Sequence, residues 1–164
     1  MSQAKSPPDD SAGCHPAGLP HVFIDRSLGR IAVPRLLRDA GLRLTTLAEH
    51  YGIPQDEDIA DVTWIEDTAR LGWVVFMKDA RIRYRPAEQE AVLTHRARCF
   101  YITRQDLPGA AMAQWLISNL PAITTACAES GPFIYAVHAT EIRKMDISAP
   151  RPRKGHHRPE SHHP

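Results

Sequence analysis

The sequence predicts an α/β fold with a mainly parallel sheet. Short apolar runs recur along the chain, and segments with helical spacing separate them. Strands that alternate with helices of this length form βαβ units with right-handed crossovers, which build a parallel sheet. In addition, every residue of the run Trp73–Met77 is apolar, which is typical of a strand buried on both faces of a sheet.

The first half of the chain supplies three strands and two helices. Ser27 offers an N-cap for the first helix, which Gly41 closes. In the second helix Thr63 and Glu66 match a capping box, and Gly72 is a stop signal. The expected strands are 21–25, 42–47 and 73–77. The first expected helix runs from the Ser27 cap to residue 40, and the second covers 61–70.

The second half continues the alternation of helix and strand. Pro86 begins a short helix, and Pro121 interrupts a longer helical region. The expected helices are 86–93, 108–120 and a continuation to about 128, and the expected strands are 98–103 and 133–138.

Length and composition indicate one domain with two polar ends. The chain of 164 residues is long enough for one ordinary core and too short for two full-sized domains. Residues 1–20 and 146–164 are rich in Pro, Ser, Gly and charge, and the second segment is also basic and rich in His. Such segments bury too little apolar surface to fold, so we expect both to be disordered and residues 21–145 to form the ordered domain.

Composition also narrows the environment of the protein. The mean hydropathy of -0.35 and the lack of a long apolar stretch argue against a membrane span. Residues 1–20 lack the apolar centre of a signal peptide, and the three cysteines have no CxxC spacing, so we expect a reducing cytoplasm. The net charge of +1 does not itself demand nucleic acid, so any attraction to it must come from local patches.

Acidic residues stand where the expected strands and helices meet. Asp25 and Asp79 each follow a strand-like run, Asp61 opens a helix, and Glu49 follows another strand-like run. In an open parallel sheet the carboxyl ends of the strands face one crevice. Carboxylates in such a crevice suit Mg²⁺, which can stabilise charge on a phosphate that is being cleaved. This is the arrangement that an acid-lined nuclease needs.

Each of these residues also has a structural interpretation. Asp25 can form a turn, Asp61 is a favoured type of helix cap, and an isolated Glu49 is most often a solvated surface acid. Arg81 and Arg83 alternate with Arg85, which puts three guanidinium groups on one side of an extended segment as a phosphate clamp, although a solvated loop fits the same pattern.

Most of the ordered chain resembles a known family. The segments 22–29, 61–65, 72–84 and 131–134 together resemble the compact PIN-like domains related to the toxin nucleases of VapBC-type toxin–antitoxin modules. This resemblance implies a three-layer α/β/α sandwich around a mainly parallel sheet, in which acids at the strand ends bind Mg²⁺ or Mn²⁺ and cleave RNA.

The resemblance also implies roles for individual residues. Asp25, Asp61 and Asp79 fall on acids that bind metal in the family. The family's second acid usually sits on a helix; Glu49 is the best candidate, and the acidic run 56–58 (Asp56, Glu57, Asp58) offers alternatives. Met77 stands where the family often has Thr or Ser.

We therefore expect a metal-dependent endoribonuclease, the toxin of a type II module with a cognate antitoxin protein as partner. In this hypothesis Arg81 and Arg83 grip the RNA phosphate, hydrolysis leaves a 5′-phosphate on one product, and a homodimer accords with the resemblance. The main rival is a non-catalytic PIN-like module that binds RNA or protein. A receiver-like phosphoacceptor domain ranks third, because the paired acid and late-strand lysine that it needs are not clear in the sequence.

Overall fold

A six-stranded sheet forms the centre of the molecule. The computed structural model describes residues 14–78, 82 and 85–147. The strand order is β2-β1-β3-β4-β5-β6, with β1 to β5 parallel and β6 antiparallel to β5. The strands are β1 (Val22–Ile24), β2 (Leu44–Thr46), β3 (Val74–Met77), β4 (Arg98–Ile102), β5 (Phe133–Val137) and β6 (Ile142–Lys144).

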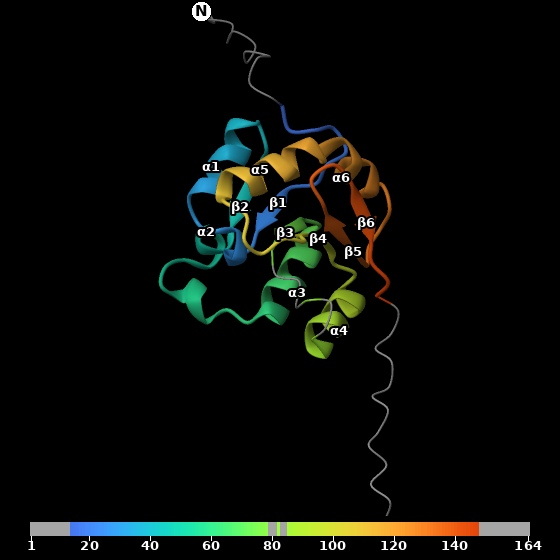
Figure 1. Cartoon of the computed structure of the whole chain (residues 1–164). Helices are drawn as coiled ribbons and strands as arrows, with labels where there is room; N and C mark the ends of the chain where they lie inside the picture. Colours follow the sequence, from blue (N-terminus) through green and yellow to red (C-terminus); the bar gives the residue numbers. More distant parts are fainter. Residues whose placement is uncertain (1–13, 79–81, 83–84, 148–164) are drawn as a thin grey trace, which may run out of the picture.

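Helices cover both faces of this sheet, as Figure 1 shows. One face carries α1 (Ala32–Asp39), α5 (Gly109–Ser118) and α6 (Leu120–Ala126). The other carries α3 (Asp61–Leu71) and α4 (Pro86–His95), with the short α2 (Leu47–Tyr51) beside the sheet edge. Two 3₁₀ turns, η1 (Arg26–Leu28) and η2 (Gln55–Asp58), complete the chain path. The α/β/α sandwich expected from the resemblance is confirmed.

The strands separate two apolar clusters. In β3, Val74 and Phe76 pack with the residues of α1, α5 and α6, whereas Val75 and Met77 pack with those of α3 and α4. This alternation follows from the two-residue period of a strand. All four side chains are buried, which confirms the prediction of a strand covered on both faces.

The first helix begins later than Ser27 predicts. Ser27 lies in η1, and α1 begins only at Ala32, with Ile31 as an N-cap residue whose side chain makes no capping hydrogen bond. The cause is Asp25, whose carboxylate accepts the Ser27 amide hydrogen and so caps the 3₁₀ turn. Ser27, which the sequence predicts as the N-cap of the first helix, therefore lies in the 3₁₀ turn that follows β1.

The capping box lies at a different helix from the one predicted. Helix α3 begins at Asp61, two residues before Thr63, and the side chain of its N-cap residue makes no hydrogen bond. A capping box is present instead at α2, between Thr46 and Glu49. Because Thr46 is the N-cap of that helix, the strand expected over 42–47 ends there.

The last third of the chain differs from the sequence prediction in two places. The break expected at Pro121 falls at Asn119, whose side-chain amide donates to the Trp115 and His138 carbonyls, both at 2.8 Å. Pro121 lies in the first turn of α6, where a missing N–H is tolerated. The edge strand β6 was not predicted, because its side chains are half-buried or exposed and carry no apolar run.

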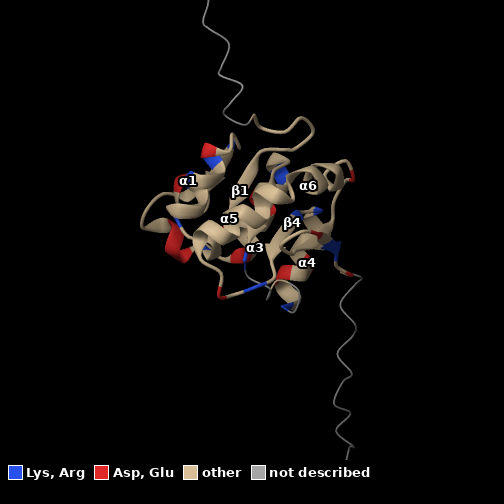
Figure 2. Cartoon of the chain, turned by 45° about the horizontal axis from the view of Figure 1, so that its top comes forward, with Lys and Arg blue, Asp and Glu red and all other residues tan. Residues whose placement is uncertain are grey.

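The packed part of the chain begins before residue 21. Leu19 is buried in the cluster under α1 and α5, and the His15 ring hydrogen-bonds with the Leu19 carbonyl at 2.7 Å. Residues 1–13 and 148–164 lie outside the described residues. In Figure 2 acidic and basic segments are interspersed over the helices and loops. Within the described residues, every helix is too short or too polar to cross a membrane.

Candidate active site

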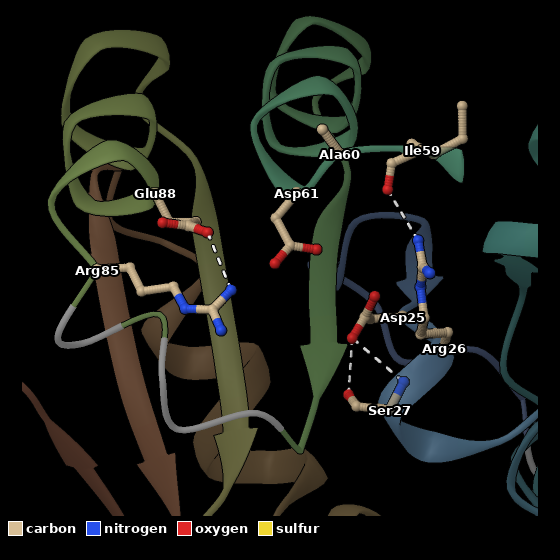
Figure 3. A pocket seen from close by; sticks show the side chains of 8 residues that line it. All are labelled: Asp25, Arg26, Ser27, Ile59, Ala60, Asp61, Arg85 and Glu88. Atoms are coloured by element: carbon tan, nitrogen blue, oxygen red, sulfur yellow. Dashed lines mark hydrogen bonds and ion pairs between the residues drawn. The ribbon is translucent and has the colours of Figure 1, made fainter. Parts of the chain in front are cut away.

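A pocket of about 500 Å³ lies beside the carboxyl end of β1. It is bounded by η1, by the chain entering α3 and by the start of α4, as Figure 3 shows. Its lining residues are Asp25, Arg26, Ser27, Ile59, Ala60, Asp61, Arg85 and Glu88. The pocket stands where ligands bind in open parallel sheets, at the ends of the strands.

Asp25 is the first residue after β1 and is only 4% exposed. Its Oδ2 accepts hydrogen bonds from the amide (3.2 Å) and the hydroxyl (2.7 Å) of Ser27. Its Oδ1 is buried and has no donor among the described residues. Burial raises the pKa of Asp25; the Ser27 hydrogen bonds oppose this rise, and the charge of Asp61 adds to it.

Asp61 is the first residue of α3, and its side chain points toward Asp25 (Figure 3). Its Oδ1 accepts a hydrogen bond of 3.0 Å from the indole nitrogen of Trp64, which is fully buried one turn later. This hydrogen bond from the buried indole restricts the orientation of the Asp61 carboxylate. Asp61 is therefore held at the pocket and is not the N-cap of its helix.

The end of β3 lies next to Asp25. The Asp25 amide donates to the Phe76 carbonyl (3.1 Å), and the Lys78 amide donates to the Ser27 hydroxyl (2.9 Å). On its other side, the Lys78 carbonyl accepts from the Gln105 side chain (3.0 Å). Asp79 follows Lys78 directly in sequence but lies, like Arg81 and Arg83, outside the described residues.

Glu49 does not line the pocket. Its carboxylate accepts the Thr46 amide (2.9 Å) in the capping box and two hydrogen bonds from Arg38 (2.6 and 2.9 Å). Burial raises the pKa of Glu49, but the hydrogen bonds from Thr46 and Arg38 outweigh burial and leave the pKa lowered. Both oxygens are thus engaged in holding α2 to α1.

The acidic run at η2 contains one buried and two exposed residues. Asp56 is 3% exposed and pairs with Arg30 at 2.5 Å, whereas Glu57 and Asp58 are exposed. Nearby, the Arg26 guanidinium donates to the carbonyls of Glu57 and Ile59. These contacts fasten the loop before Asp61 to the turn after Asp25.

One acidic residue that lines the pocket, Glu88, was not predicted from the sequence. Glu88 lies in the first turn of α4 and is 13% exposed, and its Oε1 lies 3.6 Å from the Arg85 guanidinium. Figure 3 shows this guanidinium pointing from the far wall toward Asp61. Arg85 belongs to the alternating arginines that the sequence analysis named as a phosphate clamp. Glu88 has no comparable signal in the sequence.

The pocket combines three carboxylates (Asp25, Asp61 and Glu88) with two guanidinium groups (Arg26 and Arg85). In the described part of the chain, no group of three or more His, Cys, Asp or Glu residues is arranged to hold a metal ion. Oδ1 of Asp25, which has no donor among the described residues, nevertheless suits a cation, because a buried carboxylate oxygen without a partner is costly.

Comparison with known proteins agrees with the fold. No solved structure matches the chain. The protein named "Putative ribonuclease VapC45" of Mycobacterium tuberculosis is 48% identical over 129 residues, which cover 79% of this chain and 94% of that protein. Residues 20–104, which include every residue lining the pocket, match the family described as PIN like domain. The chain therefore belongs to the PIN-like domain family, among its VapC-type members.

Proposed function

We propose that this protein is a metal-dependent endoribonuclease and the toxin of a type II toxin–antitoxin module. The observation that carries the proposal is the buried Oδ1 of Asp25, which has no donor among the described residues, in a pocket toward which Asp61 also points. Family membership and the ribonuclease name of the relative support RNA as the substrate. The protein then acts in the cytoplasm, where RNA and a reducing environment for its three free cysteines are found.

The metal is Mg²⁺ or Mn²⁺, since hard divalent ions prefer carboxylate oxygens. Asp25 and Asp61 would hold it, together with Asp79, which follows the anchored Lys78. When bound, such an ion stabilises charge on the scissile phosphate and on the leaving oxygen. Before it binds, Ser27 and Trp64 keep the two described carboxylates in place.

We assign the role of the family's second acid to Glu88, which lines the pocket. Its partner Arg85 is half-exposed. The sequence hypothesis gave this role to Glu49, and that hypothesis stays a prediction. The geometry of Glu49 favours a structural role, because Arg38 and the Thr46 amide occupy both of its carboxylate oxygens. RNA cleavage by variants in which Glu88 or Glu49 is substituted separately distinguishes the two assignments.

Arg85 supplies positive charge for the RNA phosphate. Its side chain is 46% exposed and points into the pocket from the start of α4, opposite Asp25. We predict that Arg81 and Arg83 bind further phosphates along the RNA backbone. One guanidinium group can donate two parallel hydrogen bonds to a phosphate.

The test is cleavage of an end-labelled RNA pool with Mn²⁺ or Mg²⁺. We expect cleavage by the wild type, its loss with EDTA and its loss in Asp25→Asn, Asp61→Asn and Asp79→Asn. The matched control is Asp106→Asn, an exposed acid paired with Arg104 outside the pocket. Products should carry a 5′-phosphate; a cyclic phosphate would exclude direct hydrolysis by water.

The second candidate function is RNA binding without turnover. The observation that favours it is that the described residues contain no ready group of three metal ligands. A folded wild type that binds RNA and leaves it intact with either metal would support this alternative.

The proposed partner is a cognate antitoxin. Expression of the toxin alone should arrest bacterial growth, and co-expression of the neighbouring small reading frame should restore it. Growth arrest should also disappear in Asp25→Asn. We also propose a homodimer, which light scattering of the purified chain tests directly.

A further inference from the structure

We propose that Arg26, Arg30 and Asp56 are positioning residues that fix the separation of Asp25 and Asp61 and so set the affinity of the pocket for a divalent cation. We call their contacts between the turn 26–30 and the loop 56–59 the strap. The inference rests on the proposed function for the role of the cation, but cation affinity can be measured without RNA.

The first half of the strap is Arg26, the residue after Asp25. Its guanidinium donates to the Glu57 carbonyl at 3.1 Å and to the Ile59 carbonyl at 2.8 Å. Ile59 stands two residues before Asp61. In Figure 3 the Arg26 side chain extends toward Ile59, alongside the carboxylate of Asp25. This arginine therefore ties the chain that delivers one acid to the chain that delivers the other.

The second half of the strap is the ion pair between Arg30 and Asp56. The Arg30 guanidinium lies 2.5 Å from Oδ2 of Asp56, and the arginine remains 45% exposed while the aspartate is almost fully buried. Because Asp56 is buried and its charge is paired with Arg30, the ion pair holds the loop 56–59 against the turn 26–30.

Asp56 and Asp25 also share a cavity. The two aspartates, together with Arg26 and Arg30, line a second cavity of about 10 Å³ on the inner side of the turn. Among the described residues, Oδ1 of Asp56 has no hydrogen-bond donor, as is also true of Oδ1 of Asp25. The strap therefore borders the same small cavity as the acid that would bind the cation.

The strap is needed because the two acids repel each other. Asp25 and Asp61 line one pocket and the side chain of Asp61 points toward Asp25, so their like charges face each other across it. Without a cation this repulsion favours a wider separation, and the loop 52–60 has little regular structure to resist it. The strap opposes this movement, and a site held in advance binds its ion more tightly.

The principal test compares Mn²⁺ binding by the wild type and Asp56→Asn, using calorimetry on the full chain without RNA. Asparagine keeps the shape of Asp56 but loses the ion pair. We expect the Mn²⁺ dissociation constant to rise about tenfold, the lower end of the effect of residues that orient metal ligands. In RNA cleavage, the Mn²⁺ concentration for half-maximal rate should rise in parallel, while kcat at saturating Mn²⁺ stays unchanged.

The matched control is Arg70→Ala. Arg70 pairs with Glu66 at 2.8 Å on α3, the same helix that presents Asp61, but at the end remote from the pocket. Its loss removes an arginine ion pair without touching the strap, so Mn²⁺ affinity should match the wild type.

Arg30→Ala alone leaves Asp56 buried without its partner and can prevent folding. The double variant Arg30→Ala/Asp56→Asn removes the arginine and the buried charge together. Because both residues act through one contact, its Mn²⁺ affinity should equal that of Asp56→Asn, with no further loss.

The outcomes separate the strap from the proposed function. Unchanged Mn²⁺ affinity in both folded variants overturns the strap alone. A fall in kcat at saturating Mn²⁺ with unchanged affinity also overturns it, since that result places Asp56 in the reaction itself. If the wild type binds Mn²⁺ without cleaving RNA, the proposed function fails while the strap is still decided by affinity. If the wild type binds no Mn²⁺, both fail.

Discussion

The turn after β1 and the turn after β2 present acids in similar sequence settings but use them differently. After β1, Asp25 keeps one buried oxygen free of any donor among the described residues. After β2, Glu49 has both oxygens occupied by Arg38 and the Thr46 amide. Asp25 lines the larger pocket, whereas Glu49 lies on the outer side of α2, 48% exposed.

This difference shows that an acid at a strand end is a candidate metal ligand only when its local hydrogen bonds leave some acceptor positions of its carboxylate unoccupied. A carboxylate has about four acceptor positions, and a capping box with an arginine can fill most of them. Ser27 fills only one side of Asp25. The free side costs stability, which is expected where a group is kept for binding.

The largest expected effect concerns the free oxygen. Asp25→Asn should lower the rate of RNA cleavage by more than about a hundredfold, because stabilisation by a metal ion is worth several kcal/mol and each 1.4 kcal/mol changes a rate tenfold. Single-turnover cleavage measures this effect. Glu49→Gln serves as the comparison and should keep the wild-type rate; equal losses in both variants would break the distinction between the two turns.

A smaller effect is expected for Arg85, the arginine in the same pocket. Arg85→Ala should weaken RNA binding several-fold and reduce the slope of log affinity against log salt by about 1, as for the loss of one phosphate contact. Fluorescence anisotropy with Ca²⁺ in place of Mn²⁺ measures binding without turnover. Arg104→Ala, which removes an exposed pair with Asp106, is the control; an equal change there would point to general charge.

The smallest effect is on stability and comes from Glu49. Glu49→Gln keeps the capping geometry but loses the charge pair with Arg38, so the free energy of unfolding should fall by less than about 1 kcal/mol at pH 7. Because the pKa of Glu49 is lowered in the folded protein, this stabilisation is present above the ordinary glutamate pKa and disappears as pH falls through the lowered value. Urea titrations at pH 7 and pH 3 measure it.

Asp25→Asn should show the opposite sign in the same urea titrations without metal. The pKa of Asp25 is raised by burial and by Asp61, so its charge destabilises the folded state at neutral pH and its removal should stabilise it. A loss of stability in this variant would show that Asp25 is mainly a turn former.

Much of the fold could be predicted because its strands are apolar and its helices carry clear stop signals. The run 73–77 predicts β3 correctly, and Gly72 ends α3 in the left-handed conformation that glycine favours. Strand β6 could not be predicted, because Arg143 and Lys144 are exposed and the strand exists only by pairing with β5.

Less of the pocket could be predicted. Asp25 and Asp61 were recognisable as acids at element ends, but the burial of Asp56 beside two exposed acids depends on Arg30, which lies 26 residues away in sequence. Glu88 likewise joins the pocket only because α4 packs beside α3. The hydroxyl missing at Met77 has a counterpart in Ser27, which contacts Asp25 from the neighbouring turn.

The contact between Trp64 and Asp61 has an optical consequence. The indole is fully buried and donates its N–H to a carboxylate of the pocket, whereas Trp73 and Trp115 are only partly buried and contact other groups. A change in the charge around Asp61 alters the electric field at this one indole and shifts its emission. The protein thus carries a fluorescent reporter in direct contact with a residue that lines its pocket.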